Sequence, residues 1–315
     1  EISECLVGSE MCIRDSMKSY GFEIELSWRD RIGEVDYGVK FNLADAQQKV
    51  VKYPNTTNAF SDWYAGKMSG EIWGYTSLGI AKTDEEMKEH LASLPNGGQN
   101  QLGNKWGAGD IMYADINGDG KVDGGKGTLA DPGDQRIIGN STPRYNFGLV
   151  LDASYKGFDV SIFFQGVGKR DYAPIVGTNG AVFWGAVNNI WQSMAMEEHF
   201  DYFRPEGHPM GANLNGYYPR PDFTSNKNHQ VQTRYLQDAS YIRLKNLQIG
   251  YTLPKQWINK LQINRCRVYV SGDNLWTGTS LASMFDPETL AAGDWGSGKT
   301  YPLSKVISFG LNVNF

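Results

Sequence analysis

The sequence contains no long run of apolar residues. None of its stretches approaches the roughly 18 consecutive apolar residues of a membrane-spanning helix, so a helical membrane protein is excluded. Strands that cross a membrane in a barrel leave a weaker, alternating signal. A membrane barrel is therefore still compatible with the sequence.

Charge of one sign is not concentrated anywhere in the chain. The 30 Lys and Arg residues and 35 Asp and Glu residues give a formal net charge of -5 and form no basic block. Proteins that bind nucleic acids usually carry a basic patch or stripe. We therefore expect no nucleic-acid partner.

Cysteine is scarce, with residues only at Cys5, Cys12 and Cys266. There is no CxxC motif and no nearby histidine pair, so the sequence indicates neither a disulfide framework nor a zinc site. The first two cysteines lie in Ile2–Ser16, which resembles a read-through sequence fused to unrelated open reading frames, although an ordinary amino-terminal segment is the alternative. We treat 1–16 as a non-native leader and expect the fold from residue 17 to residue 315.

Residue groupings that carry catalysis are also missing. The histidines show no metal-ligand spacing, and no serine lies in a nucleophile elbow. The carboxylate pairs Glu85-Glu86 and Glu197-Glu198 lie in polar stretches that are typical of solvated faces. We expect no catalytic residues, and we expect the protein not to be an enzyme.

Alternation of apolar and polar residues is the main positive signal. From Ile307 to Phe315, each second residue is apolar and those between are Ser, Gly or Asn. A second alternating stretch, Tyr145–Tyr155, is followed by Lys156-Gly157 and a third stretch from Phe158 to Gln165. A period of two places the two sets of side chains on opposite faces of a strand. The sequence therefore predicts strands with one apolar face, two of them joined in a hairpin.

Further strands are predicted at both ends of the chain. Tyr20–Trp28 and Tyr37–Leu43 form another hairpin, with a short connection around Asp30 to Gly33. A strand ending at Leu253 and one containing Cys266 to Val270 are separated by a short helical turn. Polar residues inside and apolar residues outside would indicate a membrane barrel, but the sequence alone does not say which face is which.

Long polar segments separate the predicted hairpins. They are rich in Gly, Asn, Asp, Trp and Pro, and they cover 95–142, 168–233 and 277–302. Loops of this length are unusual in compact soluble domains but are expected outside membrane barrels. One amphipathic helix, beginning near Lys82 with Thr83 or Asp84 as its N-cap, is predicted within a loop.

Several stretches together resemble the SusC/RagA family of TonB-linked outer-membrane transporters. They cover most of the chain after about Met17, and their order and spacing both match: GDIMYADINGDGKVD at Gly109–Asp123, GDQRIIGNSTPRYNFGLVLDASYKGFDVSIFFQG at Gly133–Gly166, YLQDASYIRLKNLQIGYTLP at Tyr235–Pro254, RVYVSGDNLW at Arg267–Trp276, and the closing strand to Phe315.

The resemblance implies an all-β fold: the carboxy-terminal part of an antiparallel transmembrane β-barrel, incomplete by itself, with long extracellular loops and one short loop helix. It implies an outer-membrane location and import of an oligomeric nutrient, a glycan or a peptide. The implied partners are a SusD-like surface lipoprotein, outer-membrane lipid, and the TonB complex, which would contact an amino-terminal region missing from these residues. The alternatives are a soluble or surface-bound β-sandwich that binds carbohydrate and, with least support, a glycan-cleaving enzyme.

One loop carries a pattern of oxygen ligands. Asp115, Asn117, Asp119 and Asp123 alternate in DINGDGKVD, and the carbonyl of Lys121 supplies a further oxygen. Hard cations such as calcium prefer these groups. Unlike an EF-hand, the twelfth position is Lys126, for which Asp131 or Asp134 could substitute only if the loop folds back. We predict a candidate calcium site here, with a solvated Asx-turn loop as the alternative; no other cofactor is expected.

Tryptophans are frequent in the loops. Their rings could stack on sugars or anchor a partner, but loop packing or a position at the membrane interface is favoured. The residues concerned are Trp63, Trp73, Trp106, Trp184, Trp191 and Trp295. No residue is assigned to substrate binding.

Overall fold

The computed structural model describes residues 15–174, 181–185, 196–222, 227–259, 262–290 and 301–315. The predicted leader at 1–16 therefore lies almost wholly outside the described residues, as do Cys5, Cys12, Trp191 and Trp295. The assignment of a non-native leader stays a prediction.

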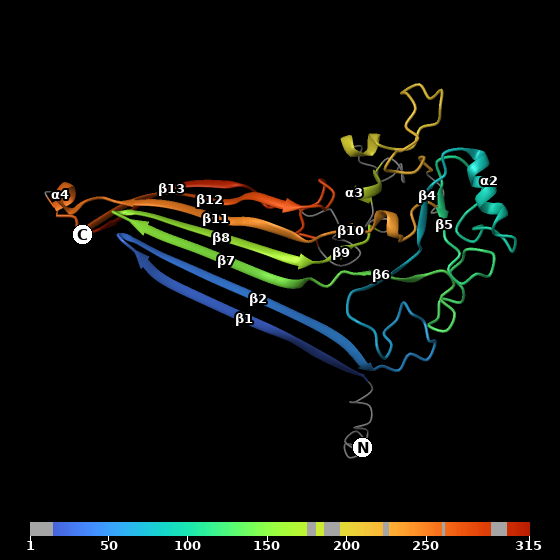
Figure 1. The fold of residues 1–315 in the computed structure, drawn as a ribbon, viewed down its shortest axis with the longest axis horizontal. Helices are drawn as coiled ribbons and strands as arrows, with labels where there is room; N and C mark the ends of the chain where they lie inside the picture. Colours follow the sequence, from blue (N-terminus) through green and yellow to red (C-terminus); the bar gives the residue numbers. More distant parts are fainter. Residues whose placement is uncertain (1–14, 175–180, 186–195, 223–226, 260–261, 291–300) are drawn as a thin grey trace, which may run out of the picture.

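One antiparallel sheet of seven strands dominates the structure (Figure 1). Its strands lie side by side in chain order: β1 (Ser16–Ile32), β2 (Val35–Lys52), β7 (Arg144–Tyr155), β8 (Phe158–Lys169), β11 (Tyr241–Thr252), β12 (Arg265–Thr279) and β13 (Val306–Asn314). Each strand therefore pairs with the next long strand, as in an up-and-down barrel. Among the described residues β1 and β13 each have one neighbour, so the sheet is open.

The connections at the two ends of the sheet differ in length. At one end β1–β2 and β7–β8 turn within two residues, and 253–264 joins β11 to β12 and carries α4 (Lys255–Ile258). In the β7–β8 turn Lys156 and Gly157 both have positive φ, 45° and 91°, as a type I′ hairpin turn requires. This hairpin confirms the prediction. The β1–β2 turn lies at Gly33-Glu34, slightly later than predicted, because β1 continues to Ile32.

The long connections gather at the other end and form a structured loop region. It contains three strand pairs, β3 (Glu71–Gly74) with β6 (Arg136–Asn140), β4 (Ser77–Ile80) with β5 (Ile111–Tyr113), and β9 (Asp171–Tyr172) with β10 (Gln237–Asp238). Its short helices are α2 (Asp84–Ala92), α3 (Ala181–Trp184), η3 (Glu197–Phe200) and η4 (Thr233–Tyr235). Helix α2 is the predicted loop helix, and Thr83 Oγ1 caps it by accepting a hydrogen bond from Glu86 N at 3.1 Å.

The main apolar core lies in this loop region and not against the sheet. It joins residues from all three long connections, among them Tyr113, Trp184, Tyr235 and Phe285. The sheet instead leaves large apolar side chains exposed, including Leu26 and Trp28, each 62% exposed, and Phe309, 85% exposed. Exposed apolar residues on this scale indicate a surface that meets something other than water.

Close packing on the sheet depends on glycine at Gly166. A Cβ there would clash with the backbone carbonyl of Tyr241 and with the ring of Phe147. At Gly38, by contrast, the three atoms nearest to a Cβ all belong to the movable carboxylate of Asp152, the first at 2.7 Å. We expect Gly166→Ala to destabilise the folded sheet by about 1–3 kcal/mol, as overpacking does, and Gly38→Ala to cost much less. Denaturant unfolding of the intact parent protein measures both; equal effects would contradict this packing.

Candidate functional site

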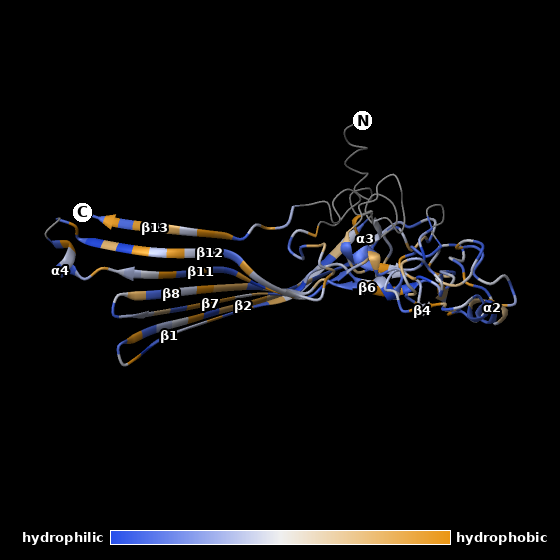
Figure 2. Ribbon diagram, turned by 90° about the horizontal axis from the view of Figure 1, so that it is seen from above, coloured by the Kyte–Doolittle hydropathy of each residue, from blue (hydrophilic) through white to orange (hydrophobic). Residues whose placement is uncertain are grey.

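Strand register sorts the side chains of the sheet into two faces. One row that crosses all seven strands is polar or glycine: Arg29, Gly38, Asp152, Ser161, Gln248, Ser271 and Ser308. The adjacent row points to the opposite face and is apolar: Trp28, Val39, Leu151, Ile162, Leu247, Gly272 and Ile307. The alternation is visible as changing colour along the strands in Figure 2.

The apolar face has the height of a bilayer core. On β1 it extends from Ile32 to Phe22, ten residues apart and interrupted by Asp30 close to the turn, which is about 34 Å along a strand. A tilt of about 35–45° reduces this to roughly 26 Å, close to the band of about 25 Å on membrane barrels. Near the turns the band ends in a row containing Tyr155, Phe158 and Tyr251, where aromatic residues suit the membrane interface.

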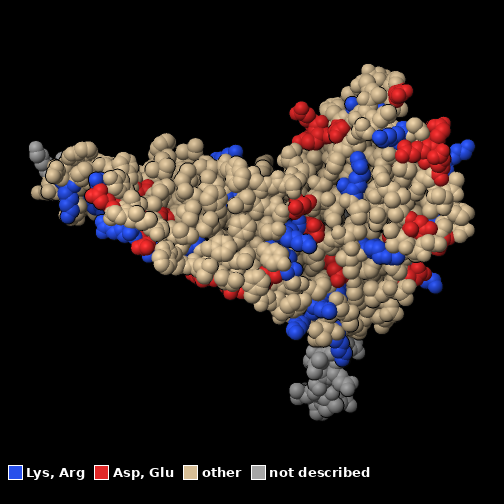
Figure 3. Space-filling view, viewed as in Figure 1, with Lys and Arg blue, Asp and Glu red and all other residues tan. Residues whose placement is uncertain are grey.

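The polar face carries ion pairs that span a whole intervening strand. Arg29 on β1 reaches Asp152 on β7 at 3.1 Å, and the pair passes over Gly38 on β2. Arg267 on β12 pairs with Asp159 on β8 beside Gly250 on β11. In the view of Figure 3, charged side chains gather over the loop region and at the turn end of the sheet, with few between. This distribution suits a sheet with one face toward lipid and one toward a water-filled interior.

Comparison with known proteins shows what this chain is similar to. The chain is 26% identical to TonB-dependent receptor P3 of Formosa agariphila over 98% of its own length and 30% of that protein's length. It is 23% identical to TonB-dependent receptor P39 of the same organism over 95% of the chain and 30% of that protein. Its fold matches the structure of the RagAB peptide transporter with a TM-score of 0.66 at 22% identity, covering 96% of this chain and 30% of that one.

This chain is thus similar in sequence to TonB-dependent receptors over nearly its whole length, and it has the fold of part of the RagAB peptide transporter. It spans about 30% of the length of the two curated relatives, and no protein-family model matches it. The relatives are described as receptors and the solved structures as a transporter or importer, none as an enzyme. Among the described helices, none has the length and apolar character needed to span a membrane.

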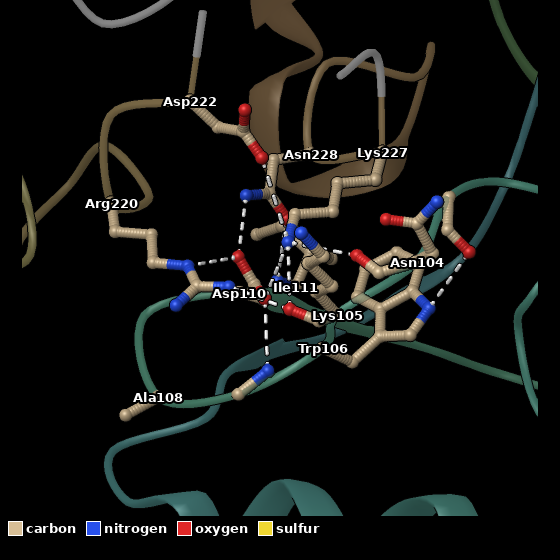
Figure 4. A network of polar contacts seen from close by, with 12 residues as sticks. Asn104, Lys105, Trp106, Ala108, Asp110, Ile111, Arg220, Asp222, Lys227 and Asn228 are labelled. Atoms are coloured by element: carbon tan, nitrogen blue, oxygen red, sulfur yellow. Dashed lines mark hydrogen bonds and ion pairs between the residues drawn. The ribbon is translucent and has the colours of Figure 1, made fainter. Parts of the chain in front are cut away.

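A buried ion-pair network joins two of the long connections (Figure 4). Asp110, just before β5, is fully buried and accepts hydrogen bonds from Arg220 Nε and Nη2, both at 2.7 Å. It also accepts from Lys227 Nζ and from Asn228 Nδ2, both at 2.9 Å. The Lys227 side chain is 1% exposed, and its ammonium lies 5.2 Å from the ring centre of Trp106. These contacts join residues more than 100 positions apart in the chain.

The predicted calcium loop has the geometry of successive Asx turns. Asp115 accepts from the backbone N–H groups of Gly118 and Gly120, at 2.7 and 2.8 Å. Asn117 accepts from Asp119 N at 2.9 Å, and Asp119 accepts from Lys121 N at 3.1 Å. These bonds correspond to the alternative weighed for this loop, in which the side chains cap its own backbone.

The loop also folds back on itself. This was the condition under which Asp131 or Asp134 could replace the missing twelfth ligand of an EF-hand. Asp134 is fully buried and accepts from Ile116 N at 2.7 Å and from Asp123 N at 2.8 Å. Burial raises the pKa of this carboxyl. The ammonium of Lys121 lies 2.5 Å from Asp123 and 3.9 Å from Asp119, where it supplies positive charge that a metal ion would otherwise provide. Among the described residues, no group of three or more His, Cys, Asp or Glu is arranged to hold a metal ion.

Calcium binding therefore stays a prediction, in which the ion competes with the Lys121 ammonium for the carboxylates. Calcium must displace the Lys121 ammonium from Asp123, so Lys121→Gln should tighten calcium binding in the intact parent protein, and Asp119→Ala should abolish it by removing a carboxylate ligand. Isothermal titration with calcium measures both variants. If neither the parent protein nor the Lys121→Gln variant shows a heat of calcium binding, the predicted site is wrong.

The loop tryptophans that the structure describes make mainly packing contacts. Trp184 is fully buried in the loop core, and Trp73 stacks on Phe60 with 4.6 Å between ring centres. Trp106 lies in the Asp110 network. Trp63 is 39% exposed, and the Lys67 ammonium lies 5.7 Å from its ring. Loop packing, the favoured interpretation of these residues, agrees with these contacts.

Proposed function

We propose that the chain forms part of the barrel wall of an outer-membrane transporter that imports an oligomeric nutrient. The observation that carries the proposal is the seven-stranded sheet with an apolar face about as high as a bilayer core and a polar face opposite. Relatives described as TonB-dependent receptors support energy coupling through TonB. The RagAB peptide importer supports a peptide as one class of cargo, with a glycan as the other.

We further propose that a SusD-like surface lipoprotein closes the mouth of the barrel over the loop region. The loop region supports this because it has its own apolar core and a buried ion-pair network, and so can present a fixed surface. A rigid surface reduces the cost of ordering side chains on binding.

The carbohydrate-binding β-sandwich has less support. A sandwich needs a second sheet packed on the apolar face. Within the described ranges the other strands form three two-stranded pairs, and the large apolar residues of β1 and β13 are exposed.

Import is tested in the native host by deleting the parent gene. We expect the deletion strain to lose growth on one class of oligomer, a peptide mixture or a glycan, and to keep growth on the corresponding monomers. Deletion of TonB should give the same loss. An affinity-tagged parent protein extracted in detergent should bring a surface lipoprotein with it. Unchanged growth on every oligomer tested contradicts the import proposal.

A further inference from the structure

We infer that two lysines at the loop end of the apolar face bind a phosphate group of the lipid in the outer leaflet. They are Lys18 on β1 and Lys49 on β2, both exposed, and are called the lysine pair below. The inference rests on the proposed function, because this face meets lipid only as part of a barrel wall. It specifies the chemistry of the lipid that the wall selects.

Strand register puts the two lysines directly opposite each other on the apolar face. Toward the loop region, the successive cross-strand pairs on this face are Phe22 with Asp45, Tyr20 with Gln47, and Lys18 with Lys49. The register is regular from Met17 onward, so a period of two keeps these side chains on one face. Like charges directly opposite in an antiparallel pair are destabilising. An anion between the two ammonium groups would remove this repulsion.

No carboxylate of the described residues compensates the lysine pair. Neither lysine takes part in an ion pair within the described ranges. Asp45 is the carboxylate in these three rows, but it is 6% exposed and engaged with Arg144. Arg144 donates from Nη2 to Asp45 Oδ2 at 2.5 Å and from Nε to Oδ1, so both carboxylate oxygens are occupied. The like-charge pair thus indicates an anion from outside these residues.

The height of the lysine pair matches the headgroup layer of a bilayer. Tyr20 lies two residues beyond Phe22, about 7 Å along the strand and roughly 5 Å along the membrane normal at a tilt of about 35–45°. The headgroup layer is roughly 5–8 Å thick on each side. The Lys18 ammonium lies 5.8 Å from the centre of the Tyr20 ring, which is 44% exposed. The ammonium is therefore at the level of lipid phosphates.

This position favours a lipid phosphate over a free phosphate ion. The acyl chains of a bound lipid can lie along the apolar rows below, while two ammonium groups meet its phosphate. Burial of the chains adds to the attraction between the charges. A free ion would gain only the contacts to the lysines, which salt screens.

The opposite end of the apolar face has no such pair. Its last two rows on β1 and β2 are Asp30 with Tyr37 and Ile32 with Val35, which contain an acid and no base. Lys156, in the neighbouring turn, is already paired with Glu34 at 2.7 Å. Uncompensated positive charge at the loop end alone suits a membrane whose outer leaflet carries phosphorylated lipid.

The test measures lipid binding to the intact parent receptor in detergent by native mass spectrometry. The probes are lipid A with both phosphates and the same lipid A after enzymatic removal of its phosphates. We expect lipid A to bind at least about 10-fold more tightly than the dephosphorylated lipid, a difference of about 1.4 kcal/mol. In the double variant Lys18→Gln with Lys49→Gln, lipid A should bind no more tightly than the dephosphorylated lipid.

Lys40→Gln is the matched control. Lys40 is an exposed lysine of the same strand β2, but it points to the polar face and pairs with Glu25 at 2.8 Å. Its loss should leave lipid A binding unchanged. Equal affinity of the parent receptor for both lipids, or an equal loss in Lys40→Gln, would overturn the inference. Complete displacement of lipid A by millimolar inorganic phosphate would also overturn it, because the lysine pair would then bind the free ion.

Unfolding in vesicles separates lipid binding from a structural role. In vesicles of dephosphorylated lipid A, Lys18→Gln should leave the unfolding midpoint unchanged or raise it, because the repulsion from Lys49 is relieved. In vesicles of lipid A the same variant should lower the midpoint. A shift of the same sign in both lipids contradicts the inference. A receptor that inserts into vesicles but shows no preference for lipid A overturns the lysine site alone, whereas failure to insert overturns the barrel wall as well.

Discussion

Leu149→Lys should destabilise the folded barrel by about 2–4 kcal/mol in lipid, since this is the cost of a lysine at the bilayer midplane. Leu149 lies in the apolar row with Leu26, Phe41 and Phe164, halfway along the apolar face. Equilibrium unfolding of the intact parent receptor in lipid vesicles measures the change in free energy of unfolding.

Val150→Lys is the control for this prediction. Val150 is the next residue on β7 and points to the polar face, in the row with Ser27, Asn246 and Asp273. A lysine there enters a polar interior, so we expect a cost well below that at Leu149. If Val150→Lys costs as much as Leu149→Lys, the assignment of the two faces is wrong.

Asp110→Ala should open the loop region locally, at a cost of about 3–5 kcal/mol. Removing one partner of a buried ion pair leaves the other charge buried without compensation, which is what makes such changes costly. Here the Lys227 ammonium, 1% exposed, and the Arg220 guanidinium would both lose the Asp110 carboxylate, and Lys227 would keep the more distant Asp222. Amide hydrogen exchange of the parent receptor should show lost protection around Trp106 and Tyr218, while the seven strands stay protected.

Asp222→Asn separates this local effect from a general one. Asp222 also faces Lys227, at 3.6 Å, but it is 25% exposed. Partly exposed pairs contribute about 0–1 kcal/mol, so this variant should change exchange little. Loss of protection of the same size in both variants would mean that the Asp110 network does not hold the loops together.

The strands could be predicted from the sequence because their signal is local. Alternation within Tyr145–Tyr155 and from Phe158 onward predicted the β7–β8 hairpin, and Lys156-Gly157 has the backbone angles that its turn needs. Alternation assigns each side chain to a face of the sheet, but it does not give the position of that side chain between the turns and the loop region. Phe309 and Leu311 are both apolar, but only the register with β12 places Leu311 in the row of Tyr251 and Phe158, closer to the turns than Phe309.

The loop region could not be predicted, because its contacts join distant parts of the chain. The carboxylate of Asp110 meets a lysine 117 residues later, and Tyr113 Oη donates to Lys227 O at 2.7 Å. No periodic pattern indicates such pairs. Glu198 was interpreted as part of a solvated face, and it is exposed. For the calcium loop, the motif indicated the ligands but not the Lys121 ammonium between them.

The central claim is that the sheet is part of an outer-membrane barrel wall, and gel mobility of the complete parent protein tests it most directly. Membranes are separated, the outer membrane is extracted with detergent, and samples are compared with and without heating. We predict a band confined to the outer-membrane fraction whose mobility shifts on heating, because a closed barrel stays folded in detergent until heated. A parent protein found in the soluble fraction, with the same mobility in both samples, contradicts the claim.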